Sequence, residues 1–434
     1  MKKLKVGCLT TFYNFESSYS LVTVVRSQLE MLMKNGYEPV LFVLPSFKDD
    51  DKVPEGVEIR KVIPQFVLEP YGKYDLRADL PDTFERDADI AKTAFLEHMK
   101  DIQVMFTHDV IFINSFLIYN KAMRDAIDQG LGHIRWLHWC HSGPSLRPSE
   151  IPSPHDLRYS IPPNSKLIYM NHVDALRMAE MYAGVLDDVR VVKNPMDLTF
   201  LYNLHPLVEK IYWDFKLYDA DVVQVYPLST PRMESNKQLS KVIKIFARMK
   251  EQGKSVRLVV PNAHANADNE KNEIERMLKL AESEGLTREE VIFTSLIDEA
   301  WAHGIPHEAV RDLFLFSNVF VFPSVSENCP LVLLEAAAAK NILVLNGSFP
   351  AMRDFFGEDA IYFEFGSSVQ NVQYKDESQY LYEVAMIIIG QLSVNRALKA
   401  NTQLKKFYNL NYLFKEKLEP LFYEDWDIIN QDKK

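Results

Sequence analysis

Two glutamates, Glu327 and Glu335, stand on either side of Pro330 in the stretch SENCPLVLLEAAAAK at residues 326–340. The apolar run VFVF at 319–322 precedes them and is typical of a buried strand. Pro330 suits the first turn of a helix, and the leucines and alanines after it favour one. Because unpaired N–H groups at a helix start attract anions, the stretch predicts a phosphate or diphosphate site beside two carboxylates.

The two carboxylates restrict the ligand further. Glu327 would repel phosphate but accept hydrogen bonds from sugar hydroxyls. Glu335, more than one turn into the helix, is expected to sit deeper and to hold a ribose. Together these groups predict a nucleotide sugar as the ligand. Further donor contacts are expected from the loop and the first helical turn, namely from Asn328, Cys329, Leu331 and Val332.

The elements that must position these residues belong to an α/β protein. Short β-branched runs alternate with amphipathic segments of helical length, which is typical of parallel sheets covered on both faces. The helix after the first strand is expected to be capped by Ser20 and to stop before Gly36. The predicted strands fall into two sets, 4–9, 40–44, 110–113, 134–140 and 166–170, then 222–226, 256–260, 291–293, 319–322 and 342–345.

The strand pattern lapses after the stretch VVKNPMD at 191–197 and restarts at Val222, which places a domain boundary near residue 200. We therefore predict two Rossmann-like domains, residues 1–200 for the acceptor side and 201–380 for the donor side. Residues 381–434 are predicted to be helices that cross back to the first domain. The segment 142–165 holds six prolines and is predicted to be a long loop. The sequence does not decide whether this loop is a plain surface excursion or a flap that covers the acceptor.

The composition fits a packed protein with an uncharged or small-molecule partner. Hydrophobic residues make up 47% and charged residues 25% of the 434 residues. A formal net charge of −11 argues against a polyanionic partner unless a local basic patch holds it. Three widely spaced cysteines predict neither a disulfide framework nor a zinc site and fit a reducing cytoplasm. No signal peptide or integral membrane segment is expected.

At this point the sequence resembles the retaining GT-B glycosyltransferases of family 4. Their E-x7-E motif is matched by Glu327 and Glu335, and their Arg-x4-Lys diphosphate clamp by Arg232 and Lys237 in LSTPRMESNK. The stretch KNPMD, with Asn194, is similar to the family's Asn-Gly-Val-Asp at the domain junction, although Pro195 replaces the glycine. The resemblance covers residues 190–425 and is only topological before them.

The resemblance implies a GT-B fold, with a cleft between the two domains, and transfer of a sugar with retention from a nucleotide-diphosphate sugar, UDP-sugar above all. Glu327 would orient the donor sugar, Glu335 the ribose, and Arg232 and Lys237 the diphosphate. It implies no metal and no other cofactor. The acceptor would be a hydroxyl of a glycan or of a lipid-linked saccharide.

Acceptor contacts are expected in the first half of the chain. The stretch IRWLHWCHSGPS ends a predicted strand, and family members carry a histidine beside the donor sugar at such a position. His141 matches that histidine better than His138, because it comes last before the loop, although Ser142 replaces the usual aspartate. The stretch TTFYNFESSYS at 10–20 replaces the family's glycine-rich loop, with Ser17, Ser18 and Ser20 as possible hydroxyl contacts. Candidate acceptor residues are therefore Ser17, Ser18, His138 and Arg147, with His141 as a catalytic residue.

Other interpretations stay open at this stage. Asp219-Ala-Asp221 has the spacing of a metal-binding DxD motif, but it precedes a strand and is expected to be a plain loop. A sugar-nucleotide 2-epimerase or a nucleotide-sugar binding protein would share the architecture. The acceptor could also be the hydroxymethylated bases of phage DNA, which would be flipped into the cleft in the host cytoplasm.

Overall fold

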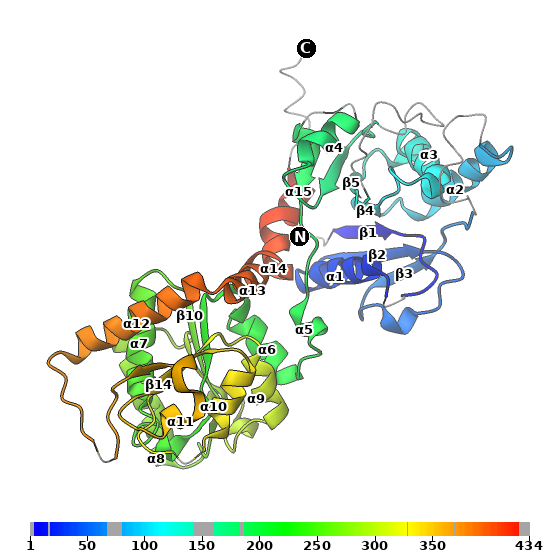
Figure 1. The fold of residues 1–434 in the computed structure, drawn as a ribbon. Helices are drawn as coiled ribbons and strands as arrows, with labels where there is room; N and C mark the ends of the chain where they lie inside the picture. Colours follow the sequence, from blue (N-terminus) through cyan, green and yellow to red (C-terminus); the bar gives the residue numbers. More distant parts are fainter. Residues whose placement is uncertain are drawn as a thin grey trace. The chain divides into compact units, whose positions relative to one another are not determined.

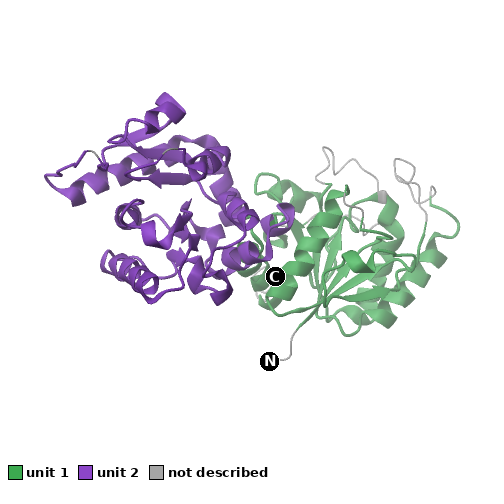
Figure 2. Ribbon diagram, turned by 90° about the horizontal axis from the view of Figure 1, so that it is seen from below, with its two compact units in different colours: residues 1–197, 408–434 green, residues 198–407 purple. Residues whose placement is uncertain are grey.

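The computed structural model describes residues 4–15, 18–66, 80–142, 160–182, 184, 186–327, 329–368 and 370–424. The chain divides into two compact units, which are described separately (Figure 2). Unit 1 contains residues 1–197 and 408–434, and unit 2 contains residues 198–407. The predicted boundary near residue 200 thus lies close to this division. The predicted segment 381–434 is divided between the units, since residues 381–407 belong to unit 2 and residues 408–434 to unit 1.

Unit 1 is built on a parallel sheet of seven strands in the order β3-β2-β1-β4-β5-β6-β7. The strands are β1 (Lys5–Leu9), β2 (Glu38–Val43), β3 (Glu58–Lys61), β4 (Val104–His108), β5 (Arg135–Trp139), β6 (Ser165–Tyr169) and β7 (Val189–Val191). The strand order reverses between β1 and β4. Ligands of open α/β sheets bind at the carboxyl ends of the strands beside such a reversal.

Helices cover both faces of this sheet (Figure 1). The core on one face combines side chains of the strands with those of α2 (Phe84–His98), α3 (Leu117–Ala126) and α4 (Ala175–Met181). The other face is covered by α1 (Ser20–Lys34), α14 (Leu410–Leu413) and α15 (Glu419–Tyr423). The hydroxyl of Tyr37, just after α1, donates to Glu419 at 2.7 Å and so joins α15 to the segment between α1 and β2.

Unit 2 contains two parallel three-stranded sheets. One consists of β12 (Val291–Phe293), β10 (Val256–Val260) and β8 (Val222–Val225), and the other of β13 (Val319–Phe322), β14 (Ile342–Asn346) and β15 (Ile361–Phe363). The buried side chain of Gln224 joins them, because its amide donates to the Val321 carbonyl and its oxygen accepts from the Val321 N–H, both at 2.9 Å. Together the strands have the Rossmann-like order β12-β10-β8-β13-β14-β15.

The helices of unit 2 form two groups. α7 (Leu239–Glu251) packs beside α8 (Asp268–Ser283) and α12 (Glu377–Val394), and α9 (His307–Phe314) packs beside α6 (Pro206–Asp214) and α10 (Leu331–Ala338) (Figure 1). α13 (Arg396–Phe407) follows α12, and the short α5 (Leu198–Leu201) and α11 (Met352–Phe356) lie in connections. Two short strands, β9 (Leu228–Ser229) and β11 (Asn262–Ala263), pair at the carboxyl ends of β8 and β10.

The predicted α/β class with two Rossmann-like parallel sheets is confirmed, whereas the cleft between the domains stays a prediction. One strand was wrong: residues 110–113 form a turn, and the strand is β4 at Val104–His108. It ends there because Asp109 takes a left-handed conformation with φ 55°. Ser20 is the first residue of α1 rather than its cap, which is Tyr19. Gly36 does follow α1 with φ 80°, which favours glycine.

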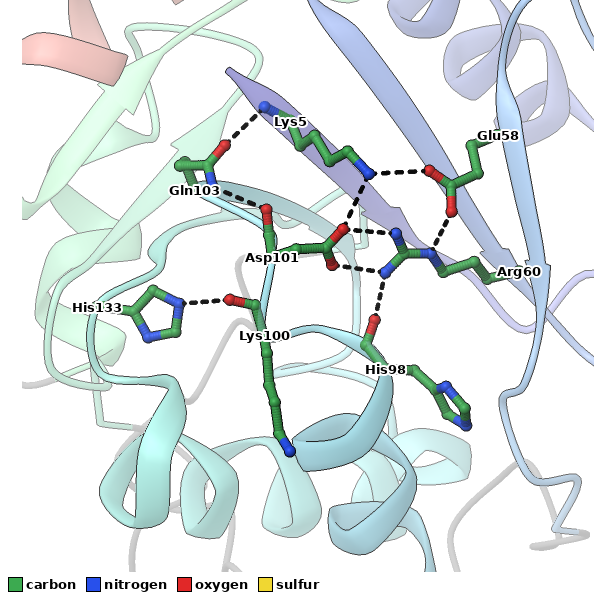
Figure 3. A network of polar contacts seen from close by, with 8 residues as sticks. All are labelled: Lys5, Glu58, Arg60, His98, Lys100, Asp101, Gln103 and His133. Carbon is green, nitrogen blue, oxygen red and sulfur yellow. Dashed lines mark hydrogen bonds and ion pairs between the residues drawn. The ribbon is translucent and has the colours of Figure 1, made fainter. Parts of the chain in front are cut away.

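A network of charged side chains ties together the amino-terminal edge of the unit 1 sheet (Figure 3). The guanidinium of Arg60 in β3 binds both carboxylate oxygens of Asp101 at 2.7 and 2.8 Å and also donates to Glu58 at 2.7 Å. The ammonium of Lys5 in β1 contacts the same two acids at 2.9 and 3.2 Å. Hydrogen bonds from Arg60 and then from Lys5 lower the pKa of Asp101. The network therefore fixes the connection before β4 against β1 and β3.

Replacing Asp101 with alanine is expected to lower the free energy of unfolding of unit 1 by about 1–2 kcal/mol at pH 7, since the bidentate pair with Arg60 is lost. The native pKa of Asp101 lies below its unfolded value, so its contribution is present above about pH 4 and fades as the pH falls further. Urea unfolding at pH 7 and at pH 3 measures both effects. The exposed Glu55→Ala is the control, and equal stability of Asp101→Ala and the control would contradict the prediction.

Candidate functional site

The first part of the candidate site is a tight loop that follows β8 and β9 in unit 2. The carbonyl of Arg232 accepts hydrogen bonds from the N–H groups of Asn236 and Lys237, at 3.2 and 3.0 Å, and closes the loop before α7. Gln238, which precedes α7, has a left-handed backbone with φ 49°. The side-chain amide of Gln238 donates to the Pro323 carbonyl at 2.6 Å and so fastens this loop to the loop that follows β13.

The centre of the site is an ion pair between Lys237 and Glu327. The Lys237 ammonium lies 2.5 Å from Oε1 of Glu327, and the two side chains are only 10% and 12% exposed. The same oxygen accepts from the Ser324 hydroxyl at 2.6 Å and from the Asn236 amide at 3.2 Å. The structure therefore brings together two of the predicted donor residues from different loops, and three donors hold the carboxylate of Glu327 in place.

The environment of Lys237 is partly apolar. Its ammonium lies 4.7 Å from the centre of the Phe322 ring, where a cation is attracted to the ring face. Burial lowers the pKa of Lys237, Glu327 opposes this shift, and the positive charge of Arg232 adds to it. Arg232 is exposed and close enough to influence Lys237. The two cations of the predicted diphosphate clamp therefore lie on one loop, one buried beside an acid and the other facing solvent.

The helix start predicted to bind an anion is present, with small differences. Pro330 is the N-cap and α10 begins at Leu331, so the proline lies one position earlier than expected. The N–H groups of Leu331 and Val332 have no acceptor within an α-helix, whereas the N–H of Leu333 donates to the Pro330 carbonyl at 3.0 Å. Leu331 is 69% exposed and Cys329 is an exposed free thiol. Asn328 lies outside the described residues.

Glu335 does not lie deeper than Glu327, contrary to the expectation from its place in the helix. Its side chain is 33% exposed, and its Oε1 accepts a hydrogen bond from Nε2 of His307, the first residue of α9, at 2.9 Å. The reason is that Glu335 lies on the outer side of α10, whose buried residues are Leu333 and Ala336. The ribose contact of Glu335 stays a prediction. A ligand can reach the carboxylate, because the side chain is partly exposed to solvent.

Asn346, at the end of β14, was missed by sequence reasoning although it organises the floor of the site. Its fully buried amide donates to the carbonyls of Ser324 and Gly366 at 3.0 and 2.6 Å. Its oxygen accepts from the N–H groups of Ser348 and Phe365 at 3.0 and 3.1 Å. The loops after β13, β14 and β15 are thereby locked together. The polar stretch NGS directly after a buried strand was the available signal.

In unit 1, His141 pairs with a histidine that the sequence analysis missed. Nδ1 of His108, the last residue of β4, lies 3.0 Å from Nε2 of His141, and the two rings stack at 5.3 Å. Burial lowers the pKa of both histidines, so both are neutral at pH 7. The carboxylate of Asp109 accepts from the N–H groups of His141 and Ser142 at 2.7 and 3.2 Å and fixes this turn. The signal was the sequence THD, which the misplaced strand at 110–113 concealed.

The other predicted residues of unit 1 are placed as follows. His138 is fully buried, and its ring nitrogens pair with the hydroxyls of Thr107 and Ser165 at 2.8 and 3.2 Å. Burial lowers its pKa to about 3. This placement argues against the acceptor contact predicted for His138, because both ring nitrogens are used inside the core. Ser18 is exposed, and Ser17, Arg147 and most of the loop 142–165 lie outside the described residues.

Two further sequence features, Asn194 and the DxD segment, lie as follows. The side-chain oxygen of Asn194 is buried and accepts no hydrogen bond from any residue that the structure describes. Asp221 lies in a loop before β8, as expected, and pairs with Lys406 at 2.7 Å. Across the described ranges, no group of three or more His, Cys, Asp or Glu residues is placed to hold a metal ion. No helix in the same ranges is long and apolar enough to cross a membrane.

Comparison with known proteins gives one informative match. Residues 223–372, which lie within unit 2, match the family model described as "Glycosyl transferases group 1". This range contains Arg232, Lys237, Glu327 and Glu335. No curated protein sequence matches the chain.

Solved structures show only a distant similarity. A glycosyltransferase from Rickettsia africae is 13% identical, with 97% of this chain and 98% of that chain covered and a TM-score of 0.36. HepE of Anabaena in complex with UDP is 12% identical, with 95% of this chain and 98% of that chain covered and a TM-score of 0.32. WaaG, a glycosyltransferase involved in lipopolysaccharide biosynthesis, is 13% identical, with 99% of this chain and 100% of that chain covered and a TM-score of 0.30.

The family match and the topology agree with each other. The matched range begins in β8 and contains the remaining strands of unit 2, with the loops at their carboxyl ends. Residues 223–372 of unit 2 thus match the model of a group 1 glycosyltransferase domain, and this match, together with the parallel sheets of the two units, agrees with the GT-B fold class predicted for the chain.

Proposed function

We propose that the protein is a retaining glycosyltransferase that transfers a sugar from a UDP-sugar to a hydroxyl of a saccharide. The observation that carries the proposal is the buried pair of Lys237 and Glu327 beside Arg232, at the carboxyl ends of β8 and β13. A diphosphate needs cations and N–H donors, which Lys237, Arg232 and the start of α10 offer. A sugar needs an acceptor for its hydroxyls. Among the described residues, the hydrogen bonds to Glu327 all reach Oε1, which leaves the second carboxylate oxygen for a sugar hydroxyl.

The residues divide the work of donor binding. Lys237 and Arg232 stabilise the negative charge that gathers on the diphosphate as it leaves, and they do so without reorganising. Glu327 orients the sugar and also keeps the ammonium of Lys237 in position. Glu335 exchanges its hydrogen bond with His307 for the ribose hydroxyls. We also retain Asn194, Asn328, Cys329, Leu331 and Val332 as proposed donor contacts.

Transfer then follows a front-face course. The bond between the anomeric carbon and the diphosphate oxygen breaks, and the acceptor oxygen bonds to the same face of that carbon. The acceptor proton passes to the departing diphosphate oxygen, which explains how the reaction proceeds without a metal or a separate base. In this proposal the side chain of His141, whose ring contacts His108 at 3.0 Å, hydrogen-bonds the transferred sugar. The free thiols of Cys8, Cys140 and Cys329 fit a cytoplasmic site of action.

Product analysis tests this function. The protein is incubated with a panel of UDP-sugars and saccharides with and without EDTA, and the anomeric configuration of the product is read by NMR. We expect a glycoside with the anomeric configuration of the donor and a rate unaffected by EDTA. An inverted product would contradict retention, and a rate abolished by EDTA and restored by Mn²⁺ would contradict metal independence. An epimerised sugar from the donor alone would identify an epimerase instead.

A further inference from the structure

A cavity in unit 1 opens at the carboxyl ends of β1 and β4. Its lining comes from the loop after β1, from the end of β4 and from the region of α3, and includes Thr11, Tyr13, Asn14, His108, Phe116 and Tyr119. This is the place in the sheet where the strand order reverses, with β1 and β4 as neighbours. Ligands of open parallel sheets bind at such a reversal.

The cavity is joined to the histidine that the proposed function uses. His108 lines it, and the ring of His108 contacts His141 at 3.0 Å. A group bound in the cavity would therefore lie next to the His108–His141 pair. On the proposed function, the bound group is the acceptor.

The lining carries no formal charge. Among the described residues that line the cavity there is no Lys, Arg, Asp or Glu. His108 is neutral, because burial and then the neighbouring His141 lower its pKa. The next residue, Asp109, is an acid whose carboxylate already accepts from the N–H groups of His141 and Ser142. A phosphate entering the cavity would lose its hydration without meeting a cation.

What the cavity does offer is neutral hydrogen-bonding groups beside aromatic rings. The side chains of Thr11, Tyr13 and Asn14 can donate to and accept from hydroxyl groups. The hydroxyl of Tyr119 is already used, since it donates to the Pro64 carbonyl at 2.7 Å and accepts from the Phe66 N–H at 3.3 Å. Its ring and that of Phe116 remain as apolar surface. Such a combination suits a sugar ring, which has hydroxyls around its edge and C–H groups on its faces.

We infer that the acceptor enters this cavity as an uncharged sugar end, and that phosphorylated sugars and nucleic acid are excluded from it. The inference rests on the proposed function for the identity of the bound group as an acceptor. The inference favours an uncharged saccharide over phosphorylated sugars and nucleic acid, between which the donor site does not distinguish.

Direct binding without any donor tests the inference. Methyl glycosides of glucose, galactose, mannose and N-acetylglucosamine, and their 6-phosphates, are titrated into the full chain and followed by saturation-transfer NMR. We expect at least one glycoside to bind, and its 6-phosphate to bind at least tenfold more weakly. Equal or tighter binding of the 6-phosphate would overturn the inference, and so would binding of none of the glycosides or their displacement by an oligonucleotide with hydroxymethylated bases.

Two variants connect the selectivity to the cavity. Asn14→Lys introduces a cation and is expected to shift the preference toward the 6-phosphate by at least tenfold, whereas Thr93→Lys adds the same charge on the exposed side of α2 and leaves the preference unchanged. Tyr13→Ala is expected to weaken glycoside binding at least fivefold. An unchanged preference in folded Asn14→Lys together with unchanged binding in Tyr13→Ala would overturn the assignment of the cavity.

The failure of this inference differs from the failure of the proposed function. Slow hydrolysis of a UDP-sugar in the absence of acceptor reports on the donor site alone. If the donor is hydrolysed while the 6-phosphates bind best, the inference fails and the proposed function stands. If glycosides bind in the cavity while no nucleotide sugar is consumed, the proposed function fails.

Discussion

Lys237→Ala is expected to lower the turnover of the nucleotide sugar by roughly two to three orders of magnitude, the cost of losing one preorganised donor to a developing negative charge. The side chain of Lys237 is 10% exposed, so the interaction of its ammonium with the diphosphate is poorly screened by solvent. Arg232 is exposed and remains in the variant, which limits the loss. Steady-state assays of UDP release at saturating donor, with folding checked by circular dichroism, measure the effect.

Lys244→Ala is the matched control for Lys237→Ala. Lys244 lies on α7 in the same unit and pairs with Glu377 at 2.7 Å, so the variant also removes one cation from an ion pair. Its turnover is expected to stay within about twofold of that of the unchanged protein, because surface ion pairs contribute little. Equal effects of the two substitutions would show that Lys237 has no special role.

Glu327→Gln is expected to lower turnover by roughly tenfold to a hundredfold and to shift its pH dependence. The substitution keeps the shape of the side chain but removes the negative charge, and a charge-assisted hydrogen bond is worth about 1.5–3 kcal/mol. Burial and Arg232 lower the pKa of Lys237, and Glu327 opposes them. Without the carboxylate, the pKa of Lys237 falls further.

The sign of the pH effect follows from the charge that catalysis requires. Turnover depends on the protonated ammonium of Lys237, so it declines as the pH rises through the pKa of that group. In Glu327→Gln this decline should begin at a lower pH than in the unchanged protein. Rate profiles between pH 6 and pH 10 measure the shift, and Glu377→Gln, which removes the acid from the Lys244 pair, is the control. If the rate declines at the same alkaline pH in the unchanged protein, in Glu327→Gln and in Glu377→Gln, then Glu327 does not keep Lys237 charged.

Most of the strands in the parallel sheets of the two units could be predicted because buried parallel strands are continuous apolar runs. The runs VFVF and VRLVV, for example, became β13 and β10. The edge strands β3 and β7, with the sequences EIRK and VRV, were missed because one side of an edge strand is polar and resembles a loop. The run at 110–113 was misplaced because apolarity alone does not separate a strand from a buried turn.

The candidate site was less predictable than the strands, because it depends on which strand ends are neighbours. Spacing within a loop indicated Arg232 and Lys237, and the loop with the following helix indicated Glu327. That Lys237 pairs with Glu327 follows only from the adjacency of β8 and β13, which Gln224 bridges with its side chain. The same limit applies to His108 and His141, whose contact requires β4 and β5 to be neighbours.

On the proposed function, a diphosphate binds between the loop of Lys237 and the start of α10. A crystal structure of the protein with UDP is the decisive measurement. We expect the diphosphate within hydrogen-bonding distance of the Lys237 ammonium and of the N–H groups of the first turn of α10, with Arg232 turned toward it and the ribose at Glu335. A diphosphate bound away from Lys237 and Glu327 would refute the proposed donor site.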